Sequence, residues 1–194
     1  MSKNEIEIKL PLKNLGEVAK FLDKHGEFSY ENHQIDTYYD DNNLTWTGRL
    51  DGKTPIDFWL RVREEGEKSS LNFKNYTCLR RADVSSCAEF ESDIAKPNDV
   101  KNILQELNYQ VIAIVDKIRR AYKFHDCEIA LDSVENLGDF IEIEYYGTEE
   151  NVNEICDLLN SVRKEIGAKT GSQDNLGYPY LLMRQNRAKR KEAK

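Results

Sequence analysis

The sequence predicts an α+β protein in which eight short strands form a sheet that suits a barrel, with helices packed on it. Eight segments alternate apolar and polar residues with a period of two, and three others repeat apolar residues with the period of a helix. Turn signals rich in Asn, Asp and Gly separate these segments. The 194 residues, 39% of them apolar, are enough for one domain with an ordinary core.

The eight predicted strands carry most of the charged residues that could form a site. Their ranges are 6–10, 34–39, 58–64, 70–76, 87–94, 115–124, 128–131 and 139–145. Residues 40–55 form the longest irregular stretch and are rich in Asn, Gly and Asp. We interpret this stretch either as a mobile loop at a mouth of the barrel or as a surface insertion.

Three predicted helices serve as a scaffold for the sheet. The first, over 14–25, begins with Asn14 and Glu17 at capping-box spacing and stops at Gly26. The second covers about 98–107, and the third covers about 149–166. Each has one apolar stripe, formed in turn by Leu15, Val18, Ala19 and Leu22, by Val100, Ile103, Leu104 and Leu107, and by Val152, Ile155, Cys156, Leu159, Val162 and Ile166.

Composition disfavours several functional classes. No stretch approaches the roughly 18 apolar residues of a membrane helix, and the first residues have no apolar signal region, so we expect a cytoplasmic protein. The formal net charge of −7 argues against a general nucleic-acid binder. The four cysteines lie far apart without a Cys-x-x-Cys pair, so we predict neither disulfides nor a zinc site.

We assign residues 1–183 to a single domain and residues 184–194 to a basic C-terminal tail. The basic residues of the tail are Arg184, Arg187, Lys189, Arg190, Lys191 and Lys194. Because aromatic residues are absent after Tyr180, we expect a frayed, solvated terminus rather than an arm that binds nucleic acid.

The segment Glu5-Ile6-Glu7-Ile8-Lys9 places ions on one face of a strand and isoleucines on the other. Side chains alternate across a strand, so Glu5, Glu7 and Lys9 point the same way. For a single strand, the simpler interpretation is the solvated face of an antiparallel sheet. The recurrence of the pattern in other strands favours a shared ionic site instead.

Several strands carry two ions of one sign at positions i and i+2. Cationic pairs occur at Arg61 and Arg63 and at Lys117 and Arg119, and Lys74 also lies opposite to apolar neighbours. Acidic pairs occur at Glu89 and Glu91 and at Glu142 and Glu144.

This segregation of sign indicates ligand chemistry. Like charges about 4 Å apart repel by roughly 4 kcal/mol at an effective dielectric near 20, so grouped glutamates need a cation if they are enclosed. An all-oxygen ligand set favours Mg²⁺ or Mn²⁺, which share phosphate oxygens with their substrates. Together with the arginine and lysine donors, the pattern predicts that the guest is a polyphosphate.

Other motifs for phosphate binding or covalent catalysis are missing from the sequence. Gly66-Glu67-Lys68-Ser69 differs from the end of a P-loop by an extra Glu, and we interpret it as a charged hairpin turn. G-x-G-x-x-G and G-x-S-x-G motifs do not occur. The metal and the cationic side chains must therefore carry the chemistry.

The ionic motifs, in their order and spacing, resemble the CYTH or triphosphate tunnel metalloenzyme superfamily. Glu5-Ile6-Glu7-Ile8-Lys9 is similar to its Glu-x-Glu-x-Lys signature. The further matching segments are Gln34-Ile35-Asp36-Thr37-Tyr38-Tyr39-Asp40, Leu60-Arg61-Val62-Arg63, Leu71-Asn72-Phe73-Lys74, Glu89-Phe90-Glu91, Lys117-Ile118-Arg119-Arg120-Ala121-Tyr122 and Asp132-x-Val134-x-x-Leu137-Gly138-x-Phe140-x-Glu142-x-Glu144. The resemblance implies a closed antiparallel barrel of eight strands whose charged faces line a tunnel, with helices packed outside.

The resemblance also implies roles for individual residues. Metal binding, of one or two Mg²⁺ or Mn²⁺ ions, is implied for Glu5, Glu7, Glu142 and Glu144. Binding of the triphosphate is implied for Lys9, Arg61, Arg63, Lys74, Lys117 and Arg119. Asp132 is expected in the site near the reacting end, with Lys117 and Arg119 as its catalytic partners, whereas strand alternation turns Arg120 away.

Within the superfamily, the chain is similar to class IV adenylyl cyclases through Gln34 to Asp40, Gly138 to Glu144 and Tyr178-Pro179-Tyr180-Leu181-Leu182. This implies conversion of ATP to cyclic AMP and pyrophosphate, and a homodimer is one assembly that such relatives adopt. The alternative is a triphosphatase acting on thiamine triphosphate, inorganic tripolyphosphate or a nucleoside triphosphate. A third hypothesis is a module that binds a phosphorylated ligand without turnover.

Overall fold

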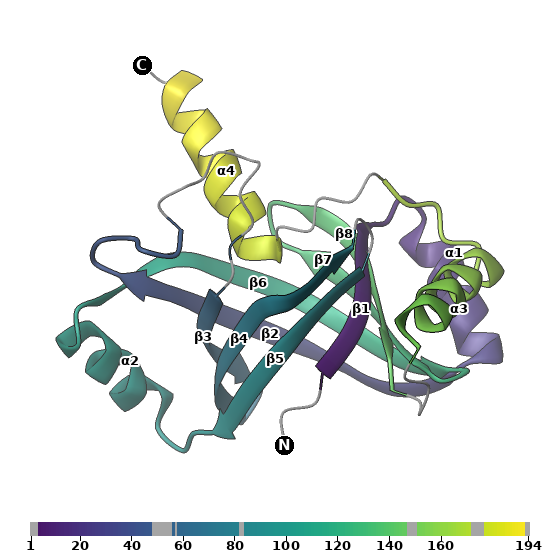
Figure 1. Ribbon diagram of the computed structural model, residues 1–194, viewed down its shortest axis with the longest axis horizontal. Coiled ribbons are helices and arrows are strands. Elements are labelled where there is room, and N and C mark those ends of the chain that lie inside the picture. The colour runs from purple at the N-terminus through teal and green to yellow at the C-terminus, as the bar shows by residue number, and fades with distance from the viewer. Residues whose placement is uncertain are drawn as a thin grey trace.

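The computed structural model describes residues 4–47, 56, 58–81, 84–146, 151–171 and 177–192 (Figure 1). For residues 4–5, 76–81, 84–87 and 190–192 it describes the backbone alone. The strands are β1 (Asn4–Pro11), β2 (Glu27–Asp41), β3 (Phe58–Glu65), β4 (Lys68–Arg81), β5 (Val84–Asp93), β6 (Tyr109–Phe124), β7 (Cys127–Val134) and β8 (Gly138–Tyr145). The helices are α1 (Leu15–His25), α2 (Pro97–Glu106), α3 (Val152–Glu165) and α4 (Gly177–Glu192).

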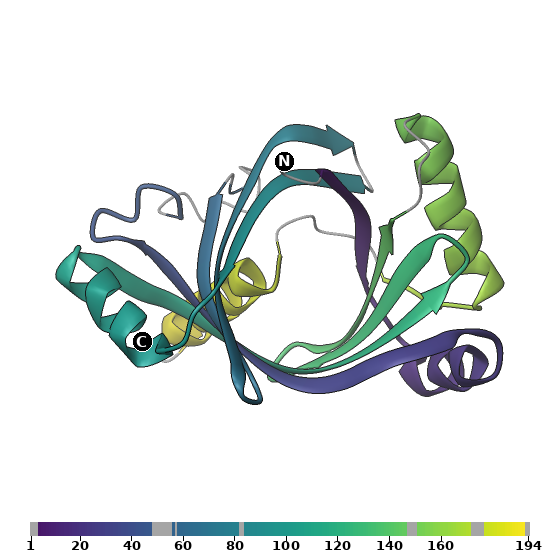
Figure 2. The same ribbon diagram turned by 90° about the horizontal axis from the view of Figure 1, so that it is seen from below.

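The strands form one closed antiparallel barrel in the order β1-β5-β4-β3-β2-β6-β7-β8. β1 closes it, because this strand pairs with β8 on one side and with β5 on the other. Figure 2 looks along the barrel and shows the strands as a ring, with α1, α2 and α3 outside it and α4 behind it. The predicted α+β barrel is confirmed.

The apolar core lies outside the barrel wall, beneath the helices. Val18 and Leu22 of α1 and Leu159 of α3 pack in one cluster with the outward faces of β1, β7 and β8, including Ile129 and Ile143. Leu104 of α2 belongs to a separate cluster with Tyr39 and Val62. Because side chains alternate, the same strands turn their ionic residues into the lumen.

Several elements differ from their predicted bounds. β2 and β6 are much longer than predicted, since residues 27–33 and 109–114 continue them. None of the residues in these added segments is fully buried, so they lack the alternation of buried and exposed positions that marks a strand in the sequence. At the start of α1, the side chain of Asn14 does not accept a hydrogen bond from a backbone N–H of the helix. Its Nδ2 instead donates to Oε2 of Glu17 at 2.9 Å.

The predicted irregular stretch 40–55 is ordered in its first part. Asp40 is buried at the end of β2, and its Oδ2 accepts a hydrogen bond from the backbone N–H of Thr47 at 2.8 Å. Asp41 likewise accepts from the backbone N–H groups of Asn43 and Thr45. Residues 48–55 lie outside the described residues.

The fourth helix, α4, was not predicted. It crosses the predicted boundary at residue 183 and continues to Glu192, so residues 184–192 are helical rather than frayed. Residues 184–189 are mostly exposed, as expected for a solvated tail. The helix starts at Gly177, whose φ of 76° favours glycine. Its first turns bury Tyr178, Tyr180 and Leu182 in a cluster with residues of β3, β6 and β8.

Figure 1 shows α4 rising from one end of the barrel. The N-terminal turn of α4 therefore covers that end, and the basic half of the helix projects away from it. In the described ranges, no helix is both long and apolar enough to cross a membrane.

Candidate active site

A polar cavity of about 210 Å³ occupies the lumen of the barrel. Six cationic side chains from four strands line it: Lys9 of β1, Arg61 and Arg63 of β3, Lys74 of β4, and Lys117 and Arg119 of β6. These are the residues for which the family resemblance implied triphosphate binding. Strand pairing brings them together from positions that are far apart in the chain.

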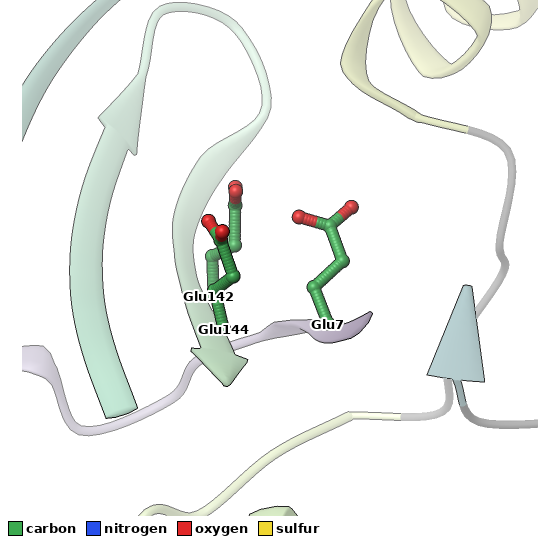
Figure 3. A group of neighbouring side chains, drawn as sticks. All are labelled: Glu7, Glu142 and Glu144. Carbon is green, nitrogen blue, oxygen red and sulfur yellow. The ribbon is translucent and has the colours of Figure 1, made fainter. Parts of the chain in front are cut away.

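Three carboxylates gather on the wall formed by β1 and β8. The side chains of Glu7, Glu142 and Glu144 each offer an oxygen, and these oxygens all lie within 4.8 Å of one another (Figure 3). The register explains the grouping, because Glu7 lies opposite Glu144 and Lys9 lies opposite Glu142. Glu5 lies on β1, but its side chain is outside the described residues, so its predicted metal role stays a prediction.

The electrostatics of this triad fit a divalent cation. Burial raises the pKa of Glu7, and the nearby charge of Glu142 raises it further although Lys9 opposes the change. For Glu142, burial is outweighed by the positive charges of Arg119, Lys9 and Lys117, which hold its pKa well below the usual value. Glu7 and Glu142 are buried and Glu144 is half-buried. Carboxylate oxygens without His or Cys are the ligand set that Mg²⁺ and Mn²⁺ prefer.

Asp132 of β7 is fully buried at the centre of a second ionic cluster. Arg119 donates to it from Nε at 2.7 Å and from Nη2 at 2.6 Å. Lys117 Nζ donates at 3.3 Å and the hydroxyl of Tyr178 donates at 2.9 Å. Although burial opposes ionisation, Arg119 and Lys117 lower the pKa of Asp132 to about 2.

Lys117 has unusual acid–base properties for a lysine. Burial and the positive charge of Arg119 lower its pKa to about 7, although Asp132 opposes the shift. Its ammonium group can therefore gain or lose a proton near neutral pH, whereas Arg119 remains charged.

On the facing wall, Asp36 of β2 holds both arginines of β3. Arg63 donates to the two oxygens of Asp36 from Nε at 2.7 Å and from Nη2 at 2.8 Å, and Arg61 Nη1 donates at 3.2 Å. Lys74 pairs with Glu89 at 2.8 Å, and the amide of Asn72 also donates to Glu89. The carboxylates of Asp36 and Glu89 thus hold these cationic side chains in fixed positions.

Two residues of the site, Asp36 and Tyr178, had no role predicted from the sequence. Both lie in quoted motifs, and the period-two pattern puts Asp36 on one face with Gln34 and Tyr38. Tyr178 enters the site from α4, and the ammonium groups of Lys9 and Lys117 lie 5.0 and 5.3 Å from its ring centroid. Only the tertiary structure reveals these contacts.

Arg120 lies outside the lumen, as strand alternation predicted. Its Nε donates to Glu31 at 2.6 Å on the outer face of the barrel, away from Lys117 and Arg119. The other predicted residues thus fall into the carboxylate triad, the cationic lining and the Asp132 cluster, except Glu5, whose side chain is not described.

Comparison with known proteins gives a family match over nearly the whole chain. A model of the CYTH domain matches residues 3–178. A protein from Methanocaldococcus jannaschii, named as a candidate adenylate cyclase, is 27% identical over 173 residues, which are 89% of this chain and 93% of that protein.

Solved structures of similar fold are more distant in sequence. A protein from Pyrococcus horikoshii has a TM-score of 0.74 at 23% identity, with coverage of 90% of this chain and 97% of that one. A candidate adenylyl cyclase from Hippeastrum, described as having a dominant triphosphatase activity, has a TM-score of 0.67 at 19% identity, with coverage of 94% and 96%. These similarities show a shared fold.

The matched range 3–178 includes all eight strands of the barrel and extends to Tyr178 at the start of α4. The motifs that carried the resemblance in the sequence line one lumen in the structure. The chain belongs to the CYTH domain family.

Proposed function

We propose that this chain is a divalent-metal-dependent enzyme that binds a triphosphate in the lumen and converts ATP to cyclic AMP and pyrophosphate. The observation that carries this proposal is the carboxylate triad of Glu7, Glu142 and Glu144 in the same barrel as six cationic side chains. The relative from M. jannaschii, named for adenylate cyclase activity, supports this choice of reaction.

In the proposed reaction, the 3′-hydroxyl of ATP attacks the α-phosphorus, and the bond from that phosphorus to the bridging oxygen breaks. The hydroxyl proton leaves to solvent, and the bridging oxygen departs with pyrophosphate. Mg²⁺ or Mn²⁺ held by Glu7, Glu142 and Glu144 would neutralise charge on the phosphate oxygens.

The side chains of the lumen divide the remaining work. Arg61, Arg63 and Lys74 bind phosphate oxygens from the wall formed by β3 and β4. Arg119 and Lys117 approach from β6 and stabilise the negative charge that develops as the α-phosphorus is attacked. Asp132 orients these two cations and is too acidic to serve as a proton acceptor near neutral pH.

The second candidate function is hydrolysis of a triphosphate, in which water attacks the terminal phosphorus. The same ionic residues would serve it, and the similar fold from Hippeastrum is described as a dominant triphosphatase. The presence of Glu7, Glu142 and Glu144 together favours turnover over mere binding of a phosphorylated ligand.

Product analysis separates these functions. Purified protein is incubated with ATP, thiamine triphosphate or tripolyphosphate, each with Mg²⁺ or Mn²⁺ and with EDTA controls, and products are resolved by ion-exchange chromatography. Cyclic AMP and pyrophosphate from ATP are expected. Orthophosphate without a cyclic product would replace the cyclase with the triphosphatase, and no product from any substrate would overturn both.

A further inference from the structure

One oxygen of the buried Asp132 carboxylate has more hydrogen-bond donors around it than it has lone pairs. Its Oδ2 accepts from Nη2 of Arg119 at 2.6 Å, from the hydroxyl of Tyr178 at 2.9 Å and from Nζ of Lys117 at 3.3 Å. A carboxylate oxygen offers two lone pairs. Arg119 and Tyr178, the two closer donors, therefore occupy both of them.

Lys117 is the donor that stays at a distance from this oxygen. A hydrogen bond between a charged nitrogen and a carboxylate is usually about 2.7–2.9 Å long, so the contact from Lys117 is a weak one. An ammonium group has three N–H donors, and two of those of Lys117 have no acceptor among the residues that the structure describes. Because Lys117 is buried in the lining of the lumen, these donors suit an anion that enters it.

Tyr178 keeps its own place at Asp132 through three contacts. Its ring packs edge-on against Phe140 with 4.9 Å between the ring centroids, and Nζ of Lys117 lies 5.3 Å from the Tyr178 centroid. Burial and the charge of Asp132 raise the pKa of Tyr178 well above its usual value, so the hydroxyl keeps its proton and remains a donor. Tyr178 therefore holds a lone pair of Asp132 that Lys117 would otherwise use.

We propose that Tyr178 is a positioning residue, whose hydroxyl occupies Asp132 and thereby keeps the ammonium group of Lys117 available to a phosphate oxygen. This proposal rests on the proposed function, since it assigns Lys117 to the bound triphosphate. Without the hydroxyl, Lys117 moves onto the lone pair that Tyr178 leaves and forms a close ion pair with Asp132. A triphosphate then has to compete with Asp132 for the ammonium group.

The same movement changes how Lys117 titrates. Among the described residues, Asp132 is the group that accepts a hydrogen bond from Nζ, so a shift of Lys117 towards it favours the charged form of the lysine. Lys117 would then be protonated at pH 8 before any ligand arrives. The other charged groups near Lys117 are Arg119 of β6, Asp36 of β2, Arg63 of β3 and Glu142 of β8, and Lys9 of β1 lies over the same Tyr178 ring.

The test compares wild-type protein with Tyr178→Phe, which removes the hydroxyl and keeps the ring. Isothermal titration calorimetry with tripolyphosphate at pH 8, without added divalent ion and in two buffers of different ionisation enthalpy, reports both affinity and proton uptake. We expect the variant to bind about tenfold more weakly, because its charged hydrogen bond to phosphate is weakened, and to lose the proton uptake of Lys117. Wild-type affinity, or a weaker affinity with wild-type proton uptake, would overturn the inference.

A double-mutant cycle shows whether Tyr178 acts through Lys117. Lys117→Met removes the ammonium group and keeps an unbranched side chain. In that background Tyr178→Phe should change the affinity for tripolyphosphate by less than about twofold. A loss as large as in the wild-type background would show that Tyr178 acts independently of Lys117 and would overturn the inference.

The matched control is Tyr180→Phe, which removes a hydroxyl from the same turn of α4 at a side chain that packs with strand residues. It should bind tripolyphosphate within about twofold of wild type, and thermal unfolding is measured for every variant. Weaker binding by Tyr180→Phe to the extent seen for Tyr178→Phe would attribute the loss to displacement of α4 and overturn the inference. Each of these results leaves the proposed function standing, whereas failure of wild type to bind tripolyphosphate would overturn both.

Discussion

Asp36 illustrates how a single residue prepares the lumen for an anion. It is 1% exposed, and burial alone would favour its neutral form, but Arg61 and Arg63 hold its pKa well below the usual value. In return, Asp36 fixes both guanidinium groups, which share one face of β3 and would otherwise repel each other. A phosphate that enters the lumen would then meet cations that are already in place.

Replacement of Asp36 should expose this dependence. Asp36→Asn removes the carboxylate that both arginines share and leaves buried Arg61 with its longer contact to Glu89, at 3.8 Å. Breaking a buried ion pair on one side typically costs about 3–5 kcal/mol. We expect a fall in Tm on the order of 10 °C, measured by circular dichroism. Tripolyphosphate should raise the Tm of the variant more than that of wild type, because it supplies the missing charge.

Asp99→Asn is the matched control, because Asp99 forms an exposed pair with Lys96 at 3.8 Å and exposed pairs contribute little. Its Tm should equal that of wild type. A Tm for Asp36→Asn as high as that of the control would refute the positioning role of Asp36.

Lys117 should couple triphosphate binding to proton uptake. Its pKa of about 7 leaves it mostly neutral at pH 8, and an arriving triphosphate favours the charged form. Binding at pH 8 should therefore take up a proton at this site, and affinity should rise as the pH falls from 8 toward 6. Calorimetry in two buffers of different ionisation enthalpy measures the uptake.

Lys117→Arg keeps the positive charge at every pH, so it should lose that proton uptake. Comparison of the two proteins also removes the contribution from titration of the ligand itself. Equal uptake by wild type and variant would show that Lys117 does not titrate on binding.

At the scale of elements, α4 connects the outer core to the lumen. Tyr180 and Leu182 pack with residues of β3, β6 and β8, and Tyr178 reaches Asp132 from the same turns. Beyond Leu182 the helix is polar and mostly exposed, so a sequence pattern alone does not reveal it. Its position depends on contacts that form only in the folded barrel.

Truncation of Tyr180 should therefore destabilise the folded protein, because its side chain is fully buried. We expect Tyr180→Ala to lower the free energy of unfolding by about 3–5 kcal/mol, as measured by urea denaturation. Arg187→Ala, on the exposed half of α4, should change it by less than about 1 kcal/mol. Similar losses in both variants would contradict the assignment of the first turns of α4 to the core.

At the scale of the whole molecule, strand alternation predicted much of the site and little of the closure. It placed Arg61 with Arg63 and Lys117 with Arg119 on common faces, and the structure places all four in the lumen. Closure depends on β1 pairing with both β5 and β8, and contacts so distant in sequence leave no periodic signal. The family resemblance supplied that element of the prediction.

The roles of Asp36 and Tyr178 depend on register and on α4, so they could not be predicted from alternation. Asp36 reaches Arg63 because β2 and β3 pair them directly. Tyr178 reaches Asp132 across a separation of 46 residues. The local sequence predicts which side chains share a face of a strand. Which of these faces meet depends on how the whole barrel closes.

In the proposed function, the carboxylate triad binds the metal on which triphosphate turnover depends. Glu7→Gln tests it most directly, because this change removes one charge with little change of shape at a buried position. Phosphate and pyrophosphate release from ATP and tripolyphosphate is measured with Mn²⁺ and with EDTA for both proteins. We expect turnover by wild type that EDTA abolishes, and at least about a hundredfold less turnover by a folded Glu7→Gln variant. Metal-dependent turnover at the wild-type rate in that variant would show that Glu7 does not bind the metal.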